Sequence, residues 1–257
     1  MTLALLAGTP QTAPGQDLSS GRWVDLTHSY SEETIYWPTA DEFRHETVFE
    51  GFTEKGFYYT AYNFSAAEHG GTHIDAPIHF AEGRKTVDQL ALDQLIGAAV
   101  VIDVVEKARA NRDYQVAVAD FEAWEAEHGR LPKGCIVLLN TGSSQFWPDK
   151  AKYMGTDRRG EEAISELHFP GLDPEAASWL VENRTIKAIG LDTPSIDYGQ
   201  STRFESHRIL FDKDIPALEN VSNLDQLPPV GAIIFALPMK IEGGSGLQPK
   251  EAPIDVG

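Results

Sequence analysis

The stretch Ala98-Ala-Val-Val-Ile-Asp-Val-Val105 is an apolar run interrupted by a single charged residue. A run of this length, rich in β-branched residues, is typical of a strand that is buried on both faces of a sheet. Similar short runs, bounded by polar or Gly/Pro residues, lie at 135–139, 186–191 and 232–236. We therefore expect these four runs to form core strands.

Further strands and helices are predicted around these runs. Residues 22–27 and 57–64 are rich in aromatic and β-branched side chains, which favours strands. Residues 120–128 contain good helix formers and end at Gly129, while Asp173-Pro174 supplies an N-cap and a first-turn proline for a second helix. Strands and helices mixed without strict alternation predict an α/β fold with a mixed, β-rich core.

The segment 143–170 differs from its surroundings because it is polar and irregular. We expect it to be a surface excursion, and long loops of this kind often cover a functional site.

Composition bounds the class of protein and its partners. A chain of 257 residues fits one large domain, and 42% hydrophobic with 23% charged residues is typical of a soluble globular protein. The 21 Lys+Arg residues against 39 Asp+Glu give a net charge of −18, and no basic run is present. These features argue against nucleic acids and anionic membranes as partners. No stretch approaches the ~20 apolar residues that span a bilayer.

Residues 1–20 are set apart from the predicted domain, which spans 21–257. They contain the short apolar stretch Leu3-Ala-Leu-Leu-Ala7 and small residues near Ala13-Pro-Gly15, but no basic region. The apolar stretch is shorter than that of most signal peptides. Two interpretations stay open: an N-terminal tail on a cytoplasmic protein, or a degenerate signal segment on a periplasmic one.

Residues 69–79 hold the densest group of metal-binding side chains: His69, His73, Asp75 and His79. Their even spacing would point all four to one face of an extended chain, but that chain would span ~33 Å, too wide for one ion. The Gly-Gly pair after His69 permits a sharp turn that brings His69 back beside His73, while His73 and Asp75 remain on one strand face. Two imidazoles and a carboxylate suit Zn²⁺, and also Mn²⁺ or Fe²⁺, so we predict a metal site here.

The run from His69 to Phe80, His-Gly-Gly-Thr-His-Ile-Asp-Ala-Pro-Ile-His-Phe, resembles the signature of the cyclase family. That family contains bacterial kynurenine formamidases and the related isatin hydrolases. The resemblance covers nearly the whole chain after residue 20. It includes Tyr36-Trp37-Pro38, the segments 190–197 and 237–240, and Ser206-His207-Arg208 followed by Glu219-Asn220.

The resemblance implies a two-metal site and a fold. It implies that His69, His73 and Asp75 bind one ion, and that Asp75, His207 and Glu219 bind a second, with Glu219 also reaching the first. Zn²⁺ is the favoured cation, with Mn²⁺ as the alternative and up to two ions per chain. The implied fold is a single domain of the swivelling β/β/α type, and the implied assembly is a homodimer or homotetramer.

The resemblance also implies a mechanism and a substrate. A metal-bound hydroxide would attack an amide carbonyl, and His79, as proton donor and acceptor, would serve the leaving nitrogen. Trp37 would line the substrate pocket. We expect an aryl formamide such as N-formylkynurenine, whose ring could lie against Trp37 and the nearby Phe57-Tyr-Tyr59.

Several alternatives stay open. The 143–170 segment looks longer than in compact formamidases, so isatin hydrolase-like opening of a cyclic amide or lactone is the second hypothesis. A metal-binding protein without catalysis is the third. Asp192 and Asp197 could orient the site or could occupy turns. Ser195 lacks the Gly-x-Ser-x-Gly pattern of a nucleophile, and we expect it in a turn.

Overall fold

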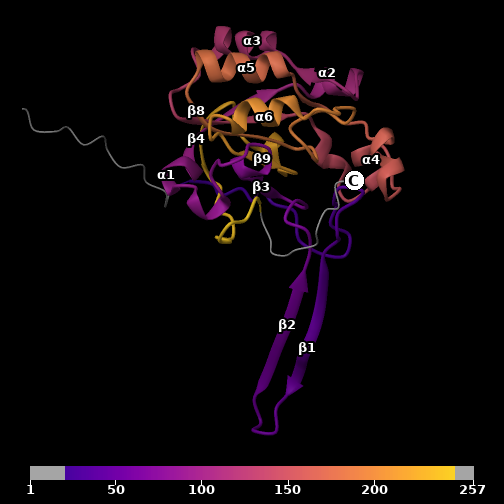
Figure 1. Ribbon diagram of the computed structural model, residues 1–257. Helices are drawn as coiled ribbons and strands as arrows, with labels where there is room; N and C mark the ends of the chain where they lie inside the picture. The colour runs from indigo at the N-terminus through magenta and orange to yellow at the C-terminus, as the bar shows by residue number, and fades with distance from the viewer. Residues whose placement is uncertain (1–20, 247–257) are drawn as a thin grey trace, which may run out of the picture.

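A six-stranded mixed sheet organises the protein, whose computed structural model describes residues 21–246 (Figure 1). The strand order is β10-β4-β6-β8-β9-β3. Three central strands run parallel to one another, and the fourth predicted run forms an edge strand antiparallel to β4. These confirmed strands are β4 (Ile96–Asp103), β6 (Cys135–Asn140), β8 (Ile186–Leu191) and β10 (Val230–Phe235).

The opposite edge of the sheet is built from two three-residue strands. β9 (Ala217–Glu219) runs parallel to β8, and β3 (His73–Asp75) pairs antiparallel with β9. In this register His73 lies directly opposite Glu219. Directly opposed residues place their side chains on the same face, with Cβ atoms about 4.5–5.5 Å apart. The sheet edge therefore brings together two residues that are far apart in the sequence.

A long hairpin projects away from the body of the protein (Figure 1). It consists of β1 (Arg44–Phe52) and β2 (Tyr58–Ser65), which pair with each other in a separate sheet. β2 confirms the strand predicted near 57–64, whereas β1 was not predicted. The strand predicted at 22–27 is wrong. That segment makes isolated contacts, such as the hydrogen bond from the Ser222 amide to the Leu26 carbonyl, and no ladder forms.

Six α-helices and five short 3₁₀ helices complete the described chain. The α-helices are α1 (Leu92–Leu95), α2 (Val105–Ala110), α3 (Val118–His128), α4 (Lys150–Met154), α5 (Pro174–Asn183) and α6 (Glu205–Phe211). The 3₁₀ helices are η1 (Pro77–His79), η2 (Val87–Gln89), η3 (Ser143–Phe146), η4 (Glu161–Glu166) and η5 (Leu224–Gln226). None of the helices between residues 21 and 246 is long and apolar enough to cross a membrane.

Helices α3 and α5 confirm the two predicted helices. The cap predicted for α5 is present, because Asp173 Oδ1 accepts a hydrogen bond from the Glu175 amide at 2.7 Å.

The segment 143–170 is more structured than predicted. It contains η3, α4 and η4, and its apolar side chains form a buried cluster with Ile35. The cluster members Tyr153, Met154, Leu167 and Phe169 are almost fully buried. The expectation of a surface excursion is therefore wrong for these residues, because apolar side chains scattered among polar ones converge once the short helices form.

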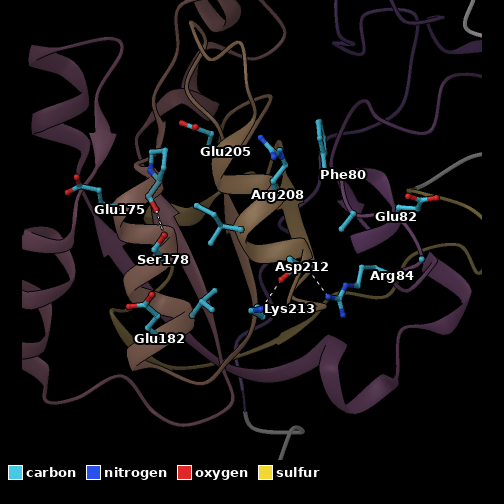
Figure 2. A pocket seen from close by; sticks show the side chains of 15 residues that line it. Phe80, Glu82, Arg84, Glu175, Ser178, Glu182, Glu205, Arg208, Asp212 and Lys213 are labelled. Atoms are coloured by element: carbon cyan, nitrogen blue, oxygen red, sulfur yellow. Dashed lines mark hydrogen bonds and ion pairs between the residues drawn. The ribbon is translucent and has the colours of Figure 1, made fainter. Parts of the chain in front are cut away.

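Helices α5 and α6 lie side by side and leave a charged groove between them and the loop after Phe80 (Figure 2). The groove has a volume of about 950 Å³. Glu175 and Glu182 project from α5, and Arg208 from α6. Neither of the two metal-compatible groups found within residues 21–246 lies in this groove.

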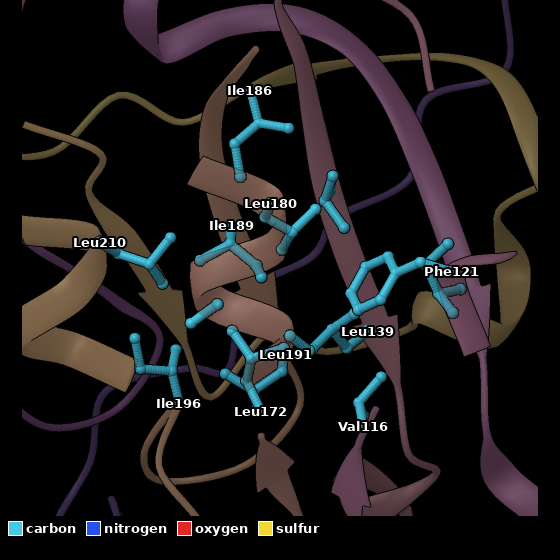
Figure 3. Close-up of a cluster of buried hydrophobic side chains, with 14 of the residues drawn as sticks. Val116, Phe121, Leu139, Leu172, Leu180, Ile186, Ile189, Leu191, Ile196 and Leu210 are labelled. Atoms are coloured by element: carbon cyan, nitrogen blue, oxygen red, sulfur yellow. The ribbon is translucent and has the colours of Figure 1, made fainter. Parts of the chain in front are cut away.

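The central strands separate two hydrophobic cores because their side chains alternate between the faces of the sheet. On the helical face, Leu139 and Ile189 pack in one cluster with Phe121 of α3 and Leu180 of α5 (Figure 3). On the other face, Leu138 belongs to a second cluster. The parallel strands are thus buried on both sides, as their continuous apolar runs predicted.

Gly171 provides a test of close backbone packing. It begins β7 (Gly171–Leu172), which pairs with β5 (Gln115–Val116), and a Cβ here would lie 2.2 Å from the backbone nitrogen of Tyr198. Because backbone atoms must move to relieve that clash, we expect Gly171→Ala to reduce the free energy of unfolding by about 1–3 kcal/mol. Urea titration measures this change. Glu122→Ala, on the exposed face of α3, is the control, and equal midpoints for both variants would contradict the prediction.

Candidate metal centre

The Gly-Gly turn places His69 as predicted. Gly71 adopts a left-handed backbone conformation with φ of 59°, which glycine reaches without a steric penalty. Gly70 bridges to Tyr36, and a Cβ at Gly70 would lie 2.1 Å from the Tyr36 ring. The chain therefore reverses here, and the His69 and His73 rings end 5.4 Å apart.

His79 reaches the same place by a different path from the one predicted. The extended chain expected from residue 73 to residue 79 is wrong, because residues 77–79 form the 3₁₀ helix η1 with Pro77 in its first turn. This turn folds His79 back over His69, and the two rings stack 3.7 Å apart. The extended chain, in which alternate residues share a face, thus ends at Asp75, and His79 is positioned by the turn η1.

Asp75 is the centre of the cluster. Its Oδ1 atom lies 2.7 Å from Nδ1 of His69 and 3.0 Å from Nε2 of His73. Its Oδ2 atom lies 3.3 Å from Nε2 of His207 and 4.0 Å from Nε2 of His79. Glu219 closes the cluster, with Oε1 at 3.1 Å from His207 Nε2 and Oε2 at 3.5 Å from His73 Nε2. The six residues named from the sequence are therefore brought together.

His207 is held in place by Asp197 at the start of α6. The two carboxylate oxygens accept hydrogen bonds from the amides of Ser206 and His207, at 3.1 and 3.2 Å. Oδ2 also accepts a hydrogen bond from His207 Nδ1 at 2.6 Å. Asp197 therefore both caps the helix and turns His207 Nε2 toward Asp75. Of the two roles left open for Asp197, the geometry supports the orienting one.

The turn at Gly71 is fixed by groups that the sequence did not reveal. The Gly71 carbonyl accepts hydrogen bonds from His73 Nδ1 at 2.9 Å and from the Asn220 side-chain amide at 2.8 Å. Asn220 Oδ1 in turn accepts a hydrogen bond from the Tyr153 hydroxyl at 2.9 Å. Asn220 belongs to the pair Glu219-Asn220 that the family resemblance includes, but no role was predicted for it.

Ser195 and Asp192 lie nearby without joining the cluster. Ser195 is buried in the irregular segment that follows β8. Asp192 accepts hydrogen bonds from the Thr141 amide and hydroxyl, at 2.9 and 2.7 Å. Asp192 therefore stabilises the loop after β6.

The charges of the cluster favour a cation. Burial lowers the pKa of His73, but the nearby Asp75 and Glu219 carboxylates outweigh it and raise that pKa to about 9. Burial and the charge of Asp75 raise the pKa of Glu219. Burial would raise the pKa of Asp75, yet the neighbouring His69 and His73 hold it well below its usual range. Burial lowers the pKa of His79 to about 3. Positive charge is thus favoured between the two carboxylates.

The donor set fits divalent metal ions. His73 Nε2 is buried and makes no hydrogen bond, although an Asp75 oxygen lies nearby, while its Nδ1 is already engaged with Gly71. A ring nitrogen presented in this way is available as a metal ligand. Two ligand groups have their donor atoms within 4.8 Å of one another: His69, Asp75 and His79, and His73, Asp75 and Glu219. Both share Asp75, as a bridging carboxylate would.

A cavity of about 240 Å³ opens onto this cluster. Trp37, the residue expected to contact substrate, lines this cavity and packs edge-on against Phe204 and Phe169 at 6.3 and 6.5 Å. Phe80 also lines it, 5.1 Å from the Phe204 ring. Phe204 precedes α6 with φ of 49°, and no sequence pattern indicated its role.

The aromatic wall expected from Phe57, Tyr58 and Tyr59 is wrong. These side chains lie at the hairpin, are about half exposed, and are absent from the residues that line the cavity. Their closeness to the site in sequence does not hold in space, because β1 and β2 carry them away from the body (Figure 1).

Comparison with known proteins identifies the family. The model of the Cyclase family, described as "Putative cyclase", matches residues 24–198. The chain belongs to the cyclase family. Isatin hydrolase from Roseibium aggregatum is 33% identical over 187 residues, covering 70% of this chain and 68% of that protein. Kynurenine formamidase from Salinibacter ruber is 29% identical over 226 residues, covering 86% and 92%.

A solved structure agrees with this assignment. Isatin hydrolase A from Ralstonia solanacearum superposes on this cyclase-family chain with a TM-score of 0.78 at 35% identity, covering 87% of this chain and 88% of that one. The mixed α/β single domain predicted from the sequence is confirmed. The N-terminal segment 1–20, with its two open interpretations, lies outside the described residues.

Asp197→Ala tests whether Asp197 orients His207. We expect this variant to bind divalent metal about 10–100-fold more weakly, because His207 loses the carboxylate that accepts a hydrogen bond from its Nδ1 atom and so orients its ring. Asp173→Ala is a matched control, since Asp173 also caps a helix but lies on α5. Both variants should lose about 1 kcal/mol of stability with the cap. Calorimetric titration with a divalent metal measures the affinity of each variant. Equal metal affinities for the two variants would contradict the orienting role of Asp197.

Proposed function

We propose that this cyclase-family protein is a metal-dependent hydrolase that cleaves an amide bond attached to an aryl ring. The observation that carries the proposal is a buried carboxylate, Asp75, which contacts three imidazoles at the end of an aromatic cavity. The names of the relatives, an isatin hydrolase and a kynurenine formamidase, support the same chemistry.

The cluster would hold its ions through named side chains. His69, His73 and Asp75 would bind one cation, while Asp75, His207 and Glu219 would bind a second, with Zn²⁺ favoured over Mn²⁺ for this mixture of nitrogen and oxygen donors. When bound, a divalent cation lowers the pKa of a coordinated water and polarises a carbonyl oxygen. Asp197 keeps His207 in the required orientation, and the Gly71 carbonyl does the same for His73.

His79 would move the proton. Hydrolysis adds water to the carbonyl carbon, breaks the C–N bond, and transfers one water proton to the leaving nitrogen. His79 lines the cavity with its side chain about 30% exposed, whereas His73 and His207 are almost fully buried. Stacking on His69 fixes its ring. Because burial lowers its pKa, the His79 imidazole is neutral before the reaction, so one ring nitrogen is free to accept the proton and then donate it to the leaving nitrogen.

The cavity would bind the aryl part of the substrate. Trp37, Phe80 and Phe204 surround it with aromatic faces and edges. Such rings favour stacked and edge-to-face contacts with another aromatic group. An aryl formamide such as N-formylkynurenine is therefore one substrate candidate.

A neutral cyclic amide such as isatin is the second candidate, and the lining of the cavity favours it. No arginine or lysine is among the described residues that line the cavity. N-formylkynurenine carries an α-carboxylate and an α-ammonium group, and no lysine or arginine of the described lining pairs with that carboxylate, so burying this charged end of the molecule is unfavourable. Isatin carries no such charge.

A metal-binding role without catalysis is the remaining hypothesis. It requires the cluster to be shielded from small molecules. The cavity instead reaches His73, Asp75, His79 and Glu219 directly, which supports catalysis.

His73→Ala and His79→Ala separate ligand from proton carrier. We expect His73→Ala to lose both metal content and activity. His79→Ala should keep nearly all its metal while its rate falls by ~10²–10⁴, the range for a lost general acid–base group. Metal analysis and steady-state rates on the same samples measure both. If His79→Ala loses metal as completely as His73→Ala, then His79 is a ligand, as its closeness to His69 and Asp75 permits.

A three-substrate panel tests the choice of amide. Isatin and N-formylaniline are uncharged, whereas N-formylkynurenine carries both a carboxylate and an ammonium group. We expect kcat/KM for the uncharged pair to exceed that for N-formylkynurenine by at least about tenfold, corresponding to roughly 1.4 kcal/mol. N-formylaniline is the control that separates charge from ring closure. Faster turnover of N-formylkynurenine than of both neutral amides would reject the charge argument.

A further inference from the structure

The last four described residues return to the metal centre. They are residues 243–246, Gly-Gly-Ser-Gly, and we call them the strap. Their composition is that of a flexible linker, yet each of them is hydrogen-bonded to the body of the protein. The Gly244 carbonyl accepts a hydrogen bond from the Val87 amide at 2.8 Å, and the Ser245 carbonyl accepts one from the Ala76 amide at 2.7 Å. Ala76 directly follows the central carboxylate of the cluster, so the strap is bound next to it.

Glu68 holds the strap through a single carboxylate oxygen. Its Oε2 atom accepts hydrogen bonds from the Ser245 amide at 2.8 Å, the Ser245 hydroxyl at 2.7 Å and the Gly246 amide at 2.9 Å. Hydrogen bonds to a carboxylate are stronger than those between neutral groups. Gly246 has no room for a side chain, because a Cβ would lie 2.7 Å from Cε1 of His69. The strap backbone therefore packs directly against the His69 ring.

The Ser245 hydroxyl determines which nitrogen of His69 faces the cluster. A hydroxyl has one hydrogen, and Ser245 donates it to Glu68. The same oxygen lies 2.9 Å from Nε2 of His69, so it can only accept there, and Nε2 carries the hydrogen of that bond. The other ring nitrogen, Nδ1, faces Asp75 Oδ1 at 2.7 Å. His69 therefore presents Nδ1, and not Nε2, to the metal centre.

The other two imidazoles assigned as ligands are held from the opposite ring nitrogen. The Gly71 carbonyl accepts a hydrogen bond from Nδ1 of His73. The Asp197 carboxylate accepts one from Nδ1 of His207. Both rings consequently present Nε2, at 3.0 and 3.3 Å from the oxygens of the central carboxylate. The Ser245 hydroxyl is a third acceptor of this kind, so each of the three rings is oriented from outside the cluster.

We propose that Glu68 and Ser245 are positioning residues of the metal centre, which hold His69 so that its Nδ1 atom binds the cation. The inference rests on the proposed metal site and adds two residues to it. An outer group that accepts a hydrogen bond from a ligating histidine fixes the ring and raises its basicity. The charge of Glu68 acts through the Ser245 hydroxyl, because hydrogen bonds in a chain polarise one another. The strap therefore contributes to metal affinity without supplying a ligand.

Metal affinity tests the two residues. Ser245→Ala removes the acceptor for the Nε2 hydrogen. Glu68→Ala frees the Ser245 hydroxyl to donate to Nε2 of His69 instead, which favours the hydrogen on Nδ1 and blocks the ligand atom. We expect the affinity for Zn²⁺, measured by competition with a chromophoric chelator, to fall about 10–100-fold in both variants.

Two further variants serve as controls for the affinity measurement. Ser245→Thr keeps the hydroxyl and should keep the affinity of the unaltered protein. Ser178→Ala is the matched control, because this half-buried serine on α5 also loses a hydrogen bond from its hydroxyl but lies away from the cluster. We expect its affinity for Zn²⁺ to be unchanged.

Magnetic resonance of the imidazoles gives a readout that a general loss of stability would not produce. In Zn²⁺-loaded protein with isotope-labelled histidine, a ligating ring keeps one hydrogen, whose position identifies the nitrogen that binds metal. We expect His69 to keep its hydrogen on Nε2, whereas His73 and His207 keep theirs on Nδ1. The contact between the His69 ring and Gly246 assigns the signal. A His69 hydrogen on Nδ1 would overturn the proposal.

The outcomes distinguish this inference from the proposed function. If the unaltered protein binds Zn²⁺ and hydrolyses an aryl amide, but Ser245→Ala binds Zn²⁺ as tightly as Ser178→Ala does, the metal centre stands and the role of the strap is rejected. If Ser245→Thr loses as much affinity as Ser245→Ala, the hydroxyl is not the group responsible, and the proposal is rejected as well. An unaltered protein that binds no divalent cation would reject both the metal centre and the role of the strap.

Discussion

A carboxylate buried among imidazoles is the interaction on which the rest of this structure depends. Asp75 is almost fully buried. One of its carboxylate oxygens faces His69 and His73, and the other faces His207. Burying such a charge is unfavourable unless it is paired and hydrogen-bonded. The Gly-Gly turn, the edge strands β3 and β9, and the start of α6 each deliver one of those partners.

The support of the site comes from ordinary elements placed at a sheet edge. The central strands and their two cores provide a rigid platform, while the short strands at the edge leave the cluster open to the cavity. Neutral groups, such as the Gly71 carbonyl and Asn220, fix the backbone beside the charges. This division of roles between a packed scaffold and the irregular segments that carry the chemistry is found in many enzymes.

The sequence predicted the features that depend on local pattern. The apolar runs of β4, β6 and β8 and the cap of α5 follow from burial and hydrogen bonding within a few residues. The strand expected at 22–27 failed because its composition favoured β-structure but no neighbouring strand pairs with it. His207 and Glu219 could be named only by family resemblance. Glu219 pairs with His73 across strands more than a hundred residues apart in the sequence, and His207 reaches the site from α6, and neither placement has a local signal. Phe204 had none either, because its position depends on the cap of α6.

The pairing of β3 with β9 has a consequence for the order in which the protein assembles. Strands β4, β6 and β8 lie between β3 and β9 in the sequence, and β9 joins the sheet through β8. We therefore expect His73 to meet Glu219 only after those strands have formed. Bringing together segments this distant requires closing a long loop, which is entropically unfavourable until the intervening strands are in place. During synthesis on the ribosome, a chain that has emerged only as far as β8 already displays His69, His73 and Asp75 without their opposing carboxylate. Capture of a cation that needs both His73 and Glu219 would therefore be one of the last events of folding.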